Sequence, residues 1–116
     1  PLPQGTRNLS RTYAIAAQAF VLHATMLISE KGIERLDTSE GHLFEKPGGG
    51  SSAIYGPDGV QLTKDMDECT EGILYADIDL DDILKAKSFL DVCGRFGRHD
   101  LLWLGVDPAA KNHVQS

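Results

Sequence analysis

Residues 48–59 constrain the fold more than any other part of this chain of 116 residues. They read Gly-Gly-Gly-Ser-Ser-Ala-Ile-Tyr-Gly-Pro-Asp-Gly. Successive glycines let the backbone bend and lie close to another segment, where a side chain would clash. The short apolar run and the Gly-Pro-Asp-Gly of residues 56–59 predict a strand that enters a tight turn. We therefore expect a strand at residues 51–56, with residues 60–63 returning beside it as a hairpin partner.

Composition limits the chain to one small domain and excludes several classes of partner. A net charge of -6 argues against binding to nucleic acid or to an anionic membrane, because both need a basic surface. No apolar run reaches the roughly 18 residues of a membrane-spanning helix, and the first residues lack the apolar core of a signal peptide. We therefore expect a cytoplasmic protein. The chain has no initiator Met, so a piece of a longer protein and a complete short protein both stay open.

The periodicity of apolar residues predicts two helices. Apolar residues recur at helical spacing from Leu9 to Phe20, and alanine is abundant between them. We expect an amphipathic helix that Asn8 caps and that packs small side chains against a sheet. A second helix is predicted at residues 80–89, capped by Asp79, with two further aspartates in its first turn where they suit the helix dipole.

Three further apolar runs predict strands, at residues 20–28, 72–79 and 101–106. The first run is almost continuously apolar, so we expect a central strand that is buried on both faces. Residues 29–47 have no period and are expected to form a long loop, of a length that is often functional or involved in assembly. Residues 107–116 are polar and are expected to form a flexible tail.

These elements predict an α/β (α+β) fold, in which a mixed sheet carries helices on one face. The predicted strands are apolar on both sides. One helix layer from this chain covers only one face of such a sheet, so we expect the other face to need a partner.

Four stretches, in order along the chain, carry a resemblance to a known family. Residues 9–25 look like the helix and strand that follow the nucleophile of that family, and residues 47–59 look like its glycine-led strand and Pro-x-Gly turn. Residues 72–89 look like the next strand and helix. Residues 91–104 look like the Asp-x-x-Gly-His-Tyr-Ser-Arg-Pro-Asp segment and the strand after it. Together they resemble the carbon–nitrogen hydrolase (nitrilase) superfamily, and more narrowly the C-terminal part of fungal nitrilases and cyanide hydratases.

The resemblance implies a fold, a reaction and a way of assembling. Residues 1–116 would form a single partial domain, the C-terminal half of an α-β-β-α sandwich. The reaction would use a Glu-Lys-Cys triad on a nitrile or cyanide, with the Cys thiolate attacking the nitrile carbon and Glu activating the water that releases the product. No cofactor and no metal would be needed. Homo-oligomers, as dimers or spirals, would be the assembled form.

No catalytic residue is assigned within this chain. The triad motifs of the family precede the helix that starts at Leu9, and residues 1–8 contain no Glu, Lys or Cys. Neither Cys69 nor Cys93 is followed by the Trp, or similar residue, of the nucleophile motif. We therefore expect the isolated chain to be inactive. The alternatives are a non-catalytic interaction or oligomerisation fragment that pairs with a related subunit, and a small stand-alone α/β binding domain.

Four residues are candidates for the wall of a substrate pocket: His23, Thr25, Gly50 and Ser51. Each has a plainer interpretation, because a histidine on an apolar strand is usually a satisfied core residue and glycines often serve close packing alone. The aspartates of residues 77–82 lack the glycine and final glutamate of a calcium loop, so no metal site is assigned.

Overall fold

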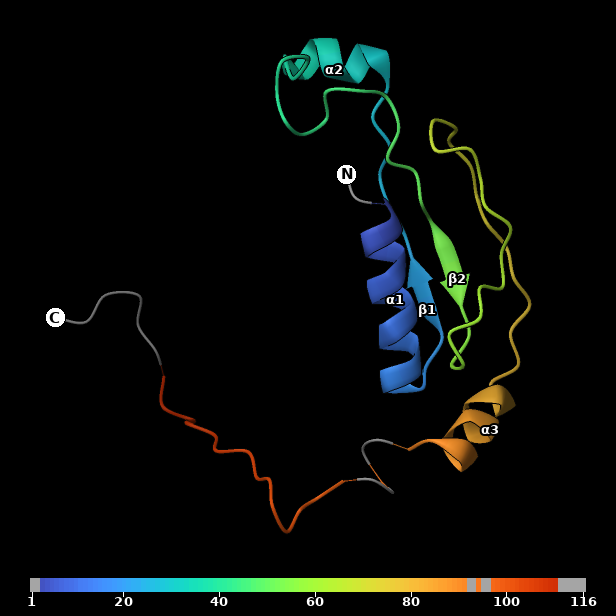
Figure 1. Ribbon diagram of the computed structural model, residues 1–116, viewed down its shortest axis with the longest axis vertical. Coiled ribbons are helices and arrows are strands. Elements are labelled where there is room, and N and C mark those ends of the chain that lie inside the picture. Colours follow the sequence, from blue (N-terminus) through green and yellow to red (C-terminus); the bar gives the residue numbers. More distant parts are fainter. Residues whose placement is uncertain (1–2, 92–93, 95–96, 111–116) are drawn as a thin grey trace, which may run out of the picture.

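The computed structural model describes residues 3–91, 94 and 97–110. Figure 1 shows helices, strands and long extended segments, in the order helix, strand, helix, strand, helix. The elements are α1 (Pro3–Ala17), β1 (Val21–His23), α2 (Glu30–Leu36), β2 (Ala53–Tyr55) and α3 (Asp81–Phe89). The α/β class is confirmed. The sheet formed by the described residues is two-stranded and antiparallel, where a mixed sheet was predicted.

The core lies where α1 packs on one face of the sheet. Strands β1 and β2 pair with Val21 opposite Tyr55, so both side chains face the same side of the sheet. Ala14 of α1 is fully buried against Ala53 and Tyr55, with Val21 packed at the margin. The small side chains of Ala14 and Ala53 let helix and sheet approach closely, as predicted for an alanine-rich helix.

Helix α1 differs from its prediction in where it starts and in which face it buries. It begins at Pro3, and Asn8 lies inside it, where its side-chain oxygen accepts a hydrogen bond from Gln4 Nε2 at 3.0 Å. The predicted cap at Asn8 is therefore wrong. Leu9 and Tyr13, expected on the packed face, are 73% and 65% exposed. The face of α1 that meets the sheet instead carries Ala14, with Arg7 and Ser10 partly buried beside it.

The first predicted strand is shorter than expected. Only Val21–His23 form β1, and Leu22 is 73% exposed, so the prediction of a central strand buried on both faces is wrong. The described part of the chain covers one face of the sheet with α1 and leaves the other open. Farther along, Ile28 and Gly48 pair through two backbone hydrogen bonds, of 2.9 and 3.0 Å.

Residues 29–47 contain helix α2, although the sequence predicted a loop. Ser29 caps the helix, since its hydroxyl accepts a hydrogen bond from the Gly32 N–H at 3.2 Å. Asp37 adopts a left-handed conformation, with φ of 52°, and ends the helix. A helix this short offers too few turns for a hydrophobic period, so its caps define it instead.

The turn after β2 forms as predicted. The Gly59 N–H donates to the Gly56 carbonyl and the Gly56 N–H donates to the Val60 carbonyl, both at 2.8 Å. Residues 60–63 return beside β2 through a bridge between Tyr55 and Gln61, without reaching the length of a strand. Gly59 lies against α1 with φ of 79°, and a Cβ there would come within 2.7 Å of Ile15 Cδ1. The glycine is therefore needed both for its conformation and for close approach.

The predicted strands at 72–79 and 101–106 do not form. Both segments are extended, and Tyr75 and Trp103 are 82% and 87% exposed. Helix α3 begins at Asp81, and its N-cap residue is Leu80 rather than the predicted Asp79. Asp79 accepts a hydrogen bond from the Asp81 N–H at 3.0 Å. None of the residues of α3 is buried. The two predicted strands have no neighbouring strand among the described residues, and α3 has no surface to pack on. An apolar pattern without such a partner is not enough to form a strand.

The end of the chain extends away from the sheet. Residues 107–110 are exposed and have no regular structure, whereas 111–116 lie outside the described residues, so the flexible tail stays a prediction. Among the described residues, no helix is long and apolar enough to cross a membrane.

Candidate functional site

A cavity of about 300 Å³ lies between the continuation of the two strands and residues 66–72. Thr25, Gly50 and Ser51, three of the four predicted pocket residues, line it. Its wall is completed by Met26, Leu27, Ser52, Met66, Asp67, Thr70, Glu71 and Gly72. The structure therefore brings together residues from three segments, 25–27, 50–52 and 66–72.

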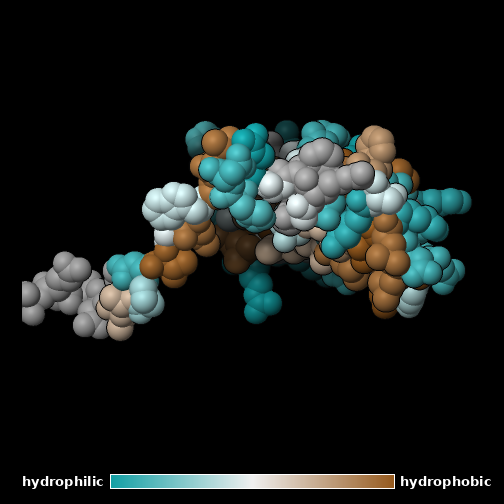
Figure 2. Space-filling view, turned by 90° about the horizontal axis from the view of Figure 1, so that it is seen from below, coloured by the Kyte–Doolittle hydropathy of each residue, from teal (hydrophilic) through white to brown (hydrophobic). Residues whose placement is uncertain are grey.

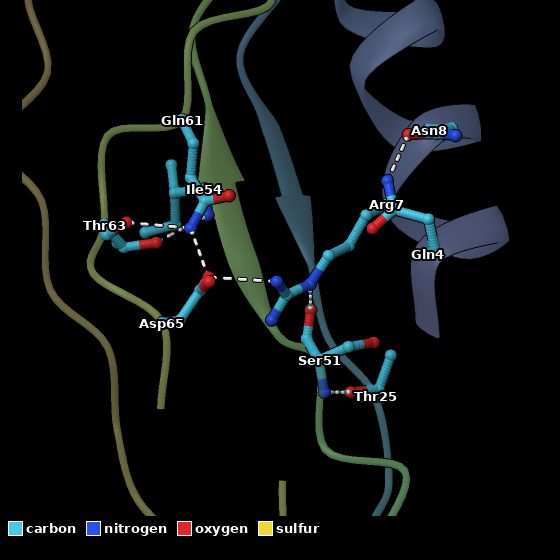
Figure 3. Close-up of polar contacts among 9 residues, drawn as sticks. All are labelled: Gln4, Arg7, Asn8, Thr25, Ser51, Ile54, Gln61, Thr63 and Asp65. Carbon is cyan, nitrogen blue, oxygen red and sulfur yellow. Dashed lines mark hydrogen bonds and ion pairs between the residues drawn. The ribbon is translucent and has the colours of Figure 1, made fainter. Parts of the chain in front are cut away.

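Hydrogen bonds between Thr25, Ser51 and Ser52 close one side of the cavity. The Ser51 N–H donates to Thr25 Oγ1 at 2.7 Å, and the Thr25 N–H donates to Ser52 Oγ at 3.0 Å. Figure 3 shows Thr25 and Ser51 side by side on the two segments. These bonds continue the pairing of the two segments beyond the ends of β1 and β2, with hydroxyl oxygens as acceptors in place of backbone carbonyls. They hold the polar atoms of the cavity wall in fixed positions.

Arg7 of α1 binds the Ser51 side of the cavity wall and links it to Asp65. Arg7 Nε donates to the Ser51 carbonyl at 3.4 Å, and its terminal nitrogen forms an ion pair with Asp65 at 3.1 Å (Figure 3). Gln61 Nε2 donates to Asp65 Oδ1 at 2.7 Å and to the Thr63 carbonyl at 2.9 Å. The hydrogen bond from Gln61, followed by those from Arg7, lowers the pKa of Asp65 below its ordinary value. Helix α1 and the segment after the hairpin are thereby tied to Ser51.

Sequence reasoning did not find Arg7. The available signal is its position on α1, seven residues before Ala14, which places it on the buried face of the helix. An arginine on the packed face of a helix needs an acidic or carbonyl partner, and Asp65 and Ser51 supply both.

Gly50 lines the cavity and packs closely on Glu68. Its N–H donates to the Glu68 carbonyl at 2.9 Å, and a Cβ at this position would come within 2.8 Å of that oxygen. The position therefore requires glycine for close packing, and the same contact seats residues 66–72 over the cavity.

His23 lies apart from the other three residues. Its Nδ1 is 2.9 Å from Ser10 Oγ of α1, and it lines a separate cavity of about 230 Å³ with Leu22, Ile73 and Leu74. Its Nε2 is buried and has no hydrogen-bond partner among the described residues. The structure therefore groups Thr25, Gly50 and Ser51, and it places His23 between helix and sheet.

The cavity offers polar groups for binding but no nucleophile with a base. Ser51 is 2% exposed, and its hydroxyl has no partner in the described part of the chain. A buried hydroxyl of this kind calls for a partner from outside the described residues. Cys69 is exposed, in a turn where Asp67 accepts its N–H at 2.9 Å. Among residues 3–91, 94 and 97–110, no cluster of histidine, cysteine and acidic side chains could hold a metal ion. Cys93 lies outside the described residues.

Comparison with known proteins gives the family. An arylacetonitrilase of Aspergillus kawachii is 53% identical over 112 residues, which are 97% of this chain and 34% of that enzyme. An arylacetonitrilase of Aspergillus niger gives the same figures, and a nitrilase of Talaromyces marneffei is 47% identical over 111 residues, 96% of this chain and 34% of the enzyme. The chain thus spans about a third of the length of these curated relatives. Residues 2–88 match the carbon–nitrogen hydrolase family, and the chain belongs to that family.

Proposed function

We propose that this chain forms the C-terminal part of a nitrilase-type enzyme that hydrolyses organic nitriles, with arylacetonitriles as the first substrate class to test. The observation that carries the proposal is the identity of about half of all residues to arylacetonitrilases, sustained over nearly the whole chain. Cyanide is the smaller alternative substrate. The relatives are about three times as long, so the chemistry of the proposal belongs to the assembled enzyme rather than to this chain by itself.

In the proposed enzyme, this chain supplies part of the pocket wall and one flank of an α-β-β-α sandwich. The open face of the sheet, which carries Leu22 opposite Ile54, is where the second sheet of such a sandwich packs. The Glu-Lys-Cys triad is contributed by polypeptide outside this chain. Thr25, Gly50 and Ser51 then line the substrate pocket, and the hydrogen bonds of the Ser51 and Gly50 N–H groups hold that wall in place.

The alternative of a non-catalytic interaction fragment has no comparable support. The similar proteins compared above are named as enzymes, and the match to them covers 97% of this chain.

A chimeric enzyme tests the proposal. This chain replaces the matching third of the Aspergillus niger arylacetonitrilase, and ammonia release from phenylacetonitrile and from cyanide is measured. We expect the chimera to release ammonia from phenylacetonitrile and the isolated chain to release none, because a thiol mechanism needs its nucleophile and base together. Turnover by the isolated chain that disappears in Cys69→Ala would show instead that a nucleophile lies within it. A folded chimera without activity on either substrate would contradict the proposed function.

The cavity wall is tested in the same chimera. Ser51→Ala removes the unpartnered hydroxyl, and we expect kcat/KM to fall roughly tenfold, the value of one lost hydrogen bond. Ser39→Ala, at an exposed position near α2, is the matched control and should leave kcat/KM unchanged. Equal kcat/KM values for both variants and the parent would remove Ser51 from the pocket.

A further inference from the structure

The two methionines of this chain both line the cavity of about 300 Å³. Met26 comes after β1, and Met66 belongs to the segment that follows the hairpin. Leu27 is the third large apolar side chain of the lining. The hydrophobic stretch that leads out toward the C-terminal end in Figure 2, residues 101–106, contributes nothing to it. A molecule bound in the cavity would therefore meet its apolar side chiefly as methionine.

The end of the Met66 side chain lies on Gly72. A Cβ at residue 72 would collide with Met66 Cε and would lie 3.4 Å from its Sδ, so the methionine occupies the space of the missing side chain. The φ of Gly72 is outside the left-handed region that favours glycine. An alanine at this position would therefore displace the flexible end of Met66 without straining the backbone.

Hydrogen bonds fix the segment of residues 66–72 against the rest of the cavity. Its Glu68 carbonyl accepts the Gly50 N–H at 2.9 Å. Within the segment, Asp67 Oδ1 accepts the Thr70 hydroxyl at 3.0 Å, which holds a turn. The methionine at the start of the segment therefore projects from a backbone whose position is set.

The wall opposite this segment is polar, and its groups are already paired. The Ser51 N–H donates to Thr25 Oγ1 at 2.7 Å, and the Thr25 N–H donates to Ser52 Oγ at 3.0 Å. An apolar ligand placed against these atoms leaves neither N–H without a partner. The volume is at the lower end of the roughly 300–1,000 Å³ of small-molecule pockets, so it suits a ligand with a single ring. A thioether makes favourable contacts with an aromatic ring and adapts to its shape.

We propose that Met26 and Met66 contact the aromatic ring of the nitrile substrate and set the preference of the enzyme for aryl over alkyl nitriles. Gly72 acts through Met66, as a positioning residue that leaves room for its methyl group. The assignment rests on the proposed nitrilase function and names the part of the substrate that this cavity receives.

The chimera with the Aspergillus niger enzyme tests this assignment through a ratio, kcat/KM for phenylacetonitrile divided by kcat/KM for propionitrile. We expect Met66→Ala and Met26→Ala each to lower the ratio about tenfold, because the ring loses an apolar contact that the short alkyl chain does not make. Met66→Leu keeps the apolar volume and should keep most of the ratio. Leu36→Ala, which truncates a 63% exposed leucine of α2, is the control and should leave the ratio unchanged.

A double-mutant cycle tests the role of Gly72. Gly72→Ala should lower the ratio in the parent chimera, because its methyl group displaces Met66 Cε. The same substitution should change nothing further in the Met66→Ala chimera, where the space is free. Gly41→Ala, remote from the cavity lining, is the matched control. An effect of Gly72→Ala that persists without Met66 would overturn the positioning role.

The outcomes separate the ring contact from the proposed function. An active chimera whose ratio is the same in both alanine variants, or whose two kcat/KM values fall equally, would overturn the ring contact alone. Met26 is 78% exposed, so its truncation costs the fold little and the test holds even where Met66→Ala does not fold. A folded chimera that releases ammonia from no nitrile would overturn the proposed function and the ring contact with it.

Discussion

Gly59 shows at the scale of one residue why the glycines of residues 48–59 constrain the fold. We expect Gly59→Ala to lower the free energy of unfolding by roughly 1–3 kcal/mol, because it combines a left-handed φ of 79° with a Cβ only 2.7 Å from Ile15 Cδ1. Gly41→Ala is the control, since Gly41 has no such φ and its Cβ would lie 3.3 Å from the nearest atom, the Thr38 carbonyl oxygen. Urea unfolding of both variants measures the difference, and equal losses would contradict the account of Gly59.

Asp65 predicts a dependence of stability on pH. Its pKa is lowered in the folded chain, first by the hydrogen bond from Gln61 and then by Arg7, from an ordinary value of 3.8. The ionised carboxylate therefore stabilises the fold above that ordinary pKa, and the contribution is lost as pH falls through the lower folded value. Asp65→Asn should cost about 0.2–1 kcal/mol at pH 7, because the Asp65 side chain is 60% exposed and solvent screens its charge, and nothing at a pH well below the folded pKa.

Urea unfolding at neutral and strongly acidic pH measures this difference. Glu40→Gln, which removes a charge at another exposed position, provides the control and should show no comparable change. A loss for Asp65→Asn that is the same at both pH values would mean that the carboxylate contributes nothing through its ionisation.

The roles of single residues could be predicted from sequence where the backbone conformation requires a particular residue type. Gly50 was expected to allow close approach, and a Cβ there would meet the Glu68 backbone; Gly59 was expected in a turn, and its φ of 79° fits that position. Thr25 and Ser51 were predicted as pocket residues, and they are joined by a hydrogen bond across the two segments. Arg7 was missed because its partners lie 44 and 58 positions away in the sequence, and no local pattern links an arginine to carbonyls and carboxylates that distant.

The turn at residues 56–59 forms as predicted, and Thr63 holds the segment that returns beside β2. Thr63 is 8% exposed, and its hydroxyl accepts the Ile54 N–H at 3.2 Å. We expect Thr63→Val, which keeps the shape, to cost about 1–3 kcal/mol, because it leaves a backbone N–H without its partner. Thr12→Val, at an exposed position of α1, should be nearly neutral. Thermal unfolding measures both variants, and a neutral Thr63→Val would show that water replaces the hydroxyl.

Elements were predicted well where a local pattern and a packing surface coincide. Helix α1 and the turn after β2 meet both conditions. The predicted strands at 72–79 and 101–106 have the pattern of a strand but no neighbouring strand in the described chain, so they remain extended and exposed. Helix α2 is the reverse case. It forms although its sequence has no apolar period, because Ser29 and Asp37 cap its two ends.

The molecule as a whole is far more open than a compact domain. Its radius of gyration is 19.7 Å, whereas a compact domain of this length has about 13 Å. The isolated chain therefore buries little surface, and we expect its urea m-value to fall well below that of a compact domain of equal length. Joining the chain to the rest of the enzyme in the chimera should raise both the m-value and the midpoint. A steep, cooperative transition of the isolated chain at low protein concentration would contradict this view.

The paired hydrogen bonds between Ile28 and Gly48 have a consequence for how this family can vary. They join the two ends of the segment that contains α2. Residues 29–47 therefore form a loop that leaves the sheet and returns to it at the same place. A longer loop between these two residues costs little extra entropy to close, because the entropy of loop closure grows only with the logarithm of loop length. Insertions, deletions or a proteolytic cut within residues 30–46 thus leave the register of β1 and β2 unchanged. The cavity wall formed by Thr25, Gly50 and Ser51 should keep its geometry when this segment is changed.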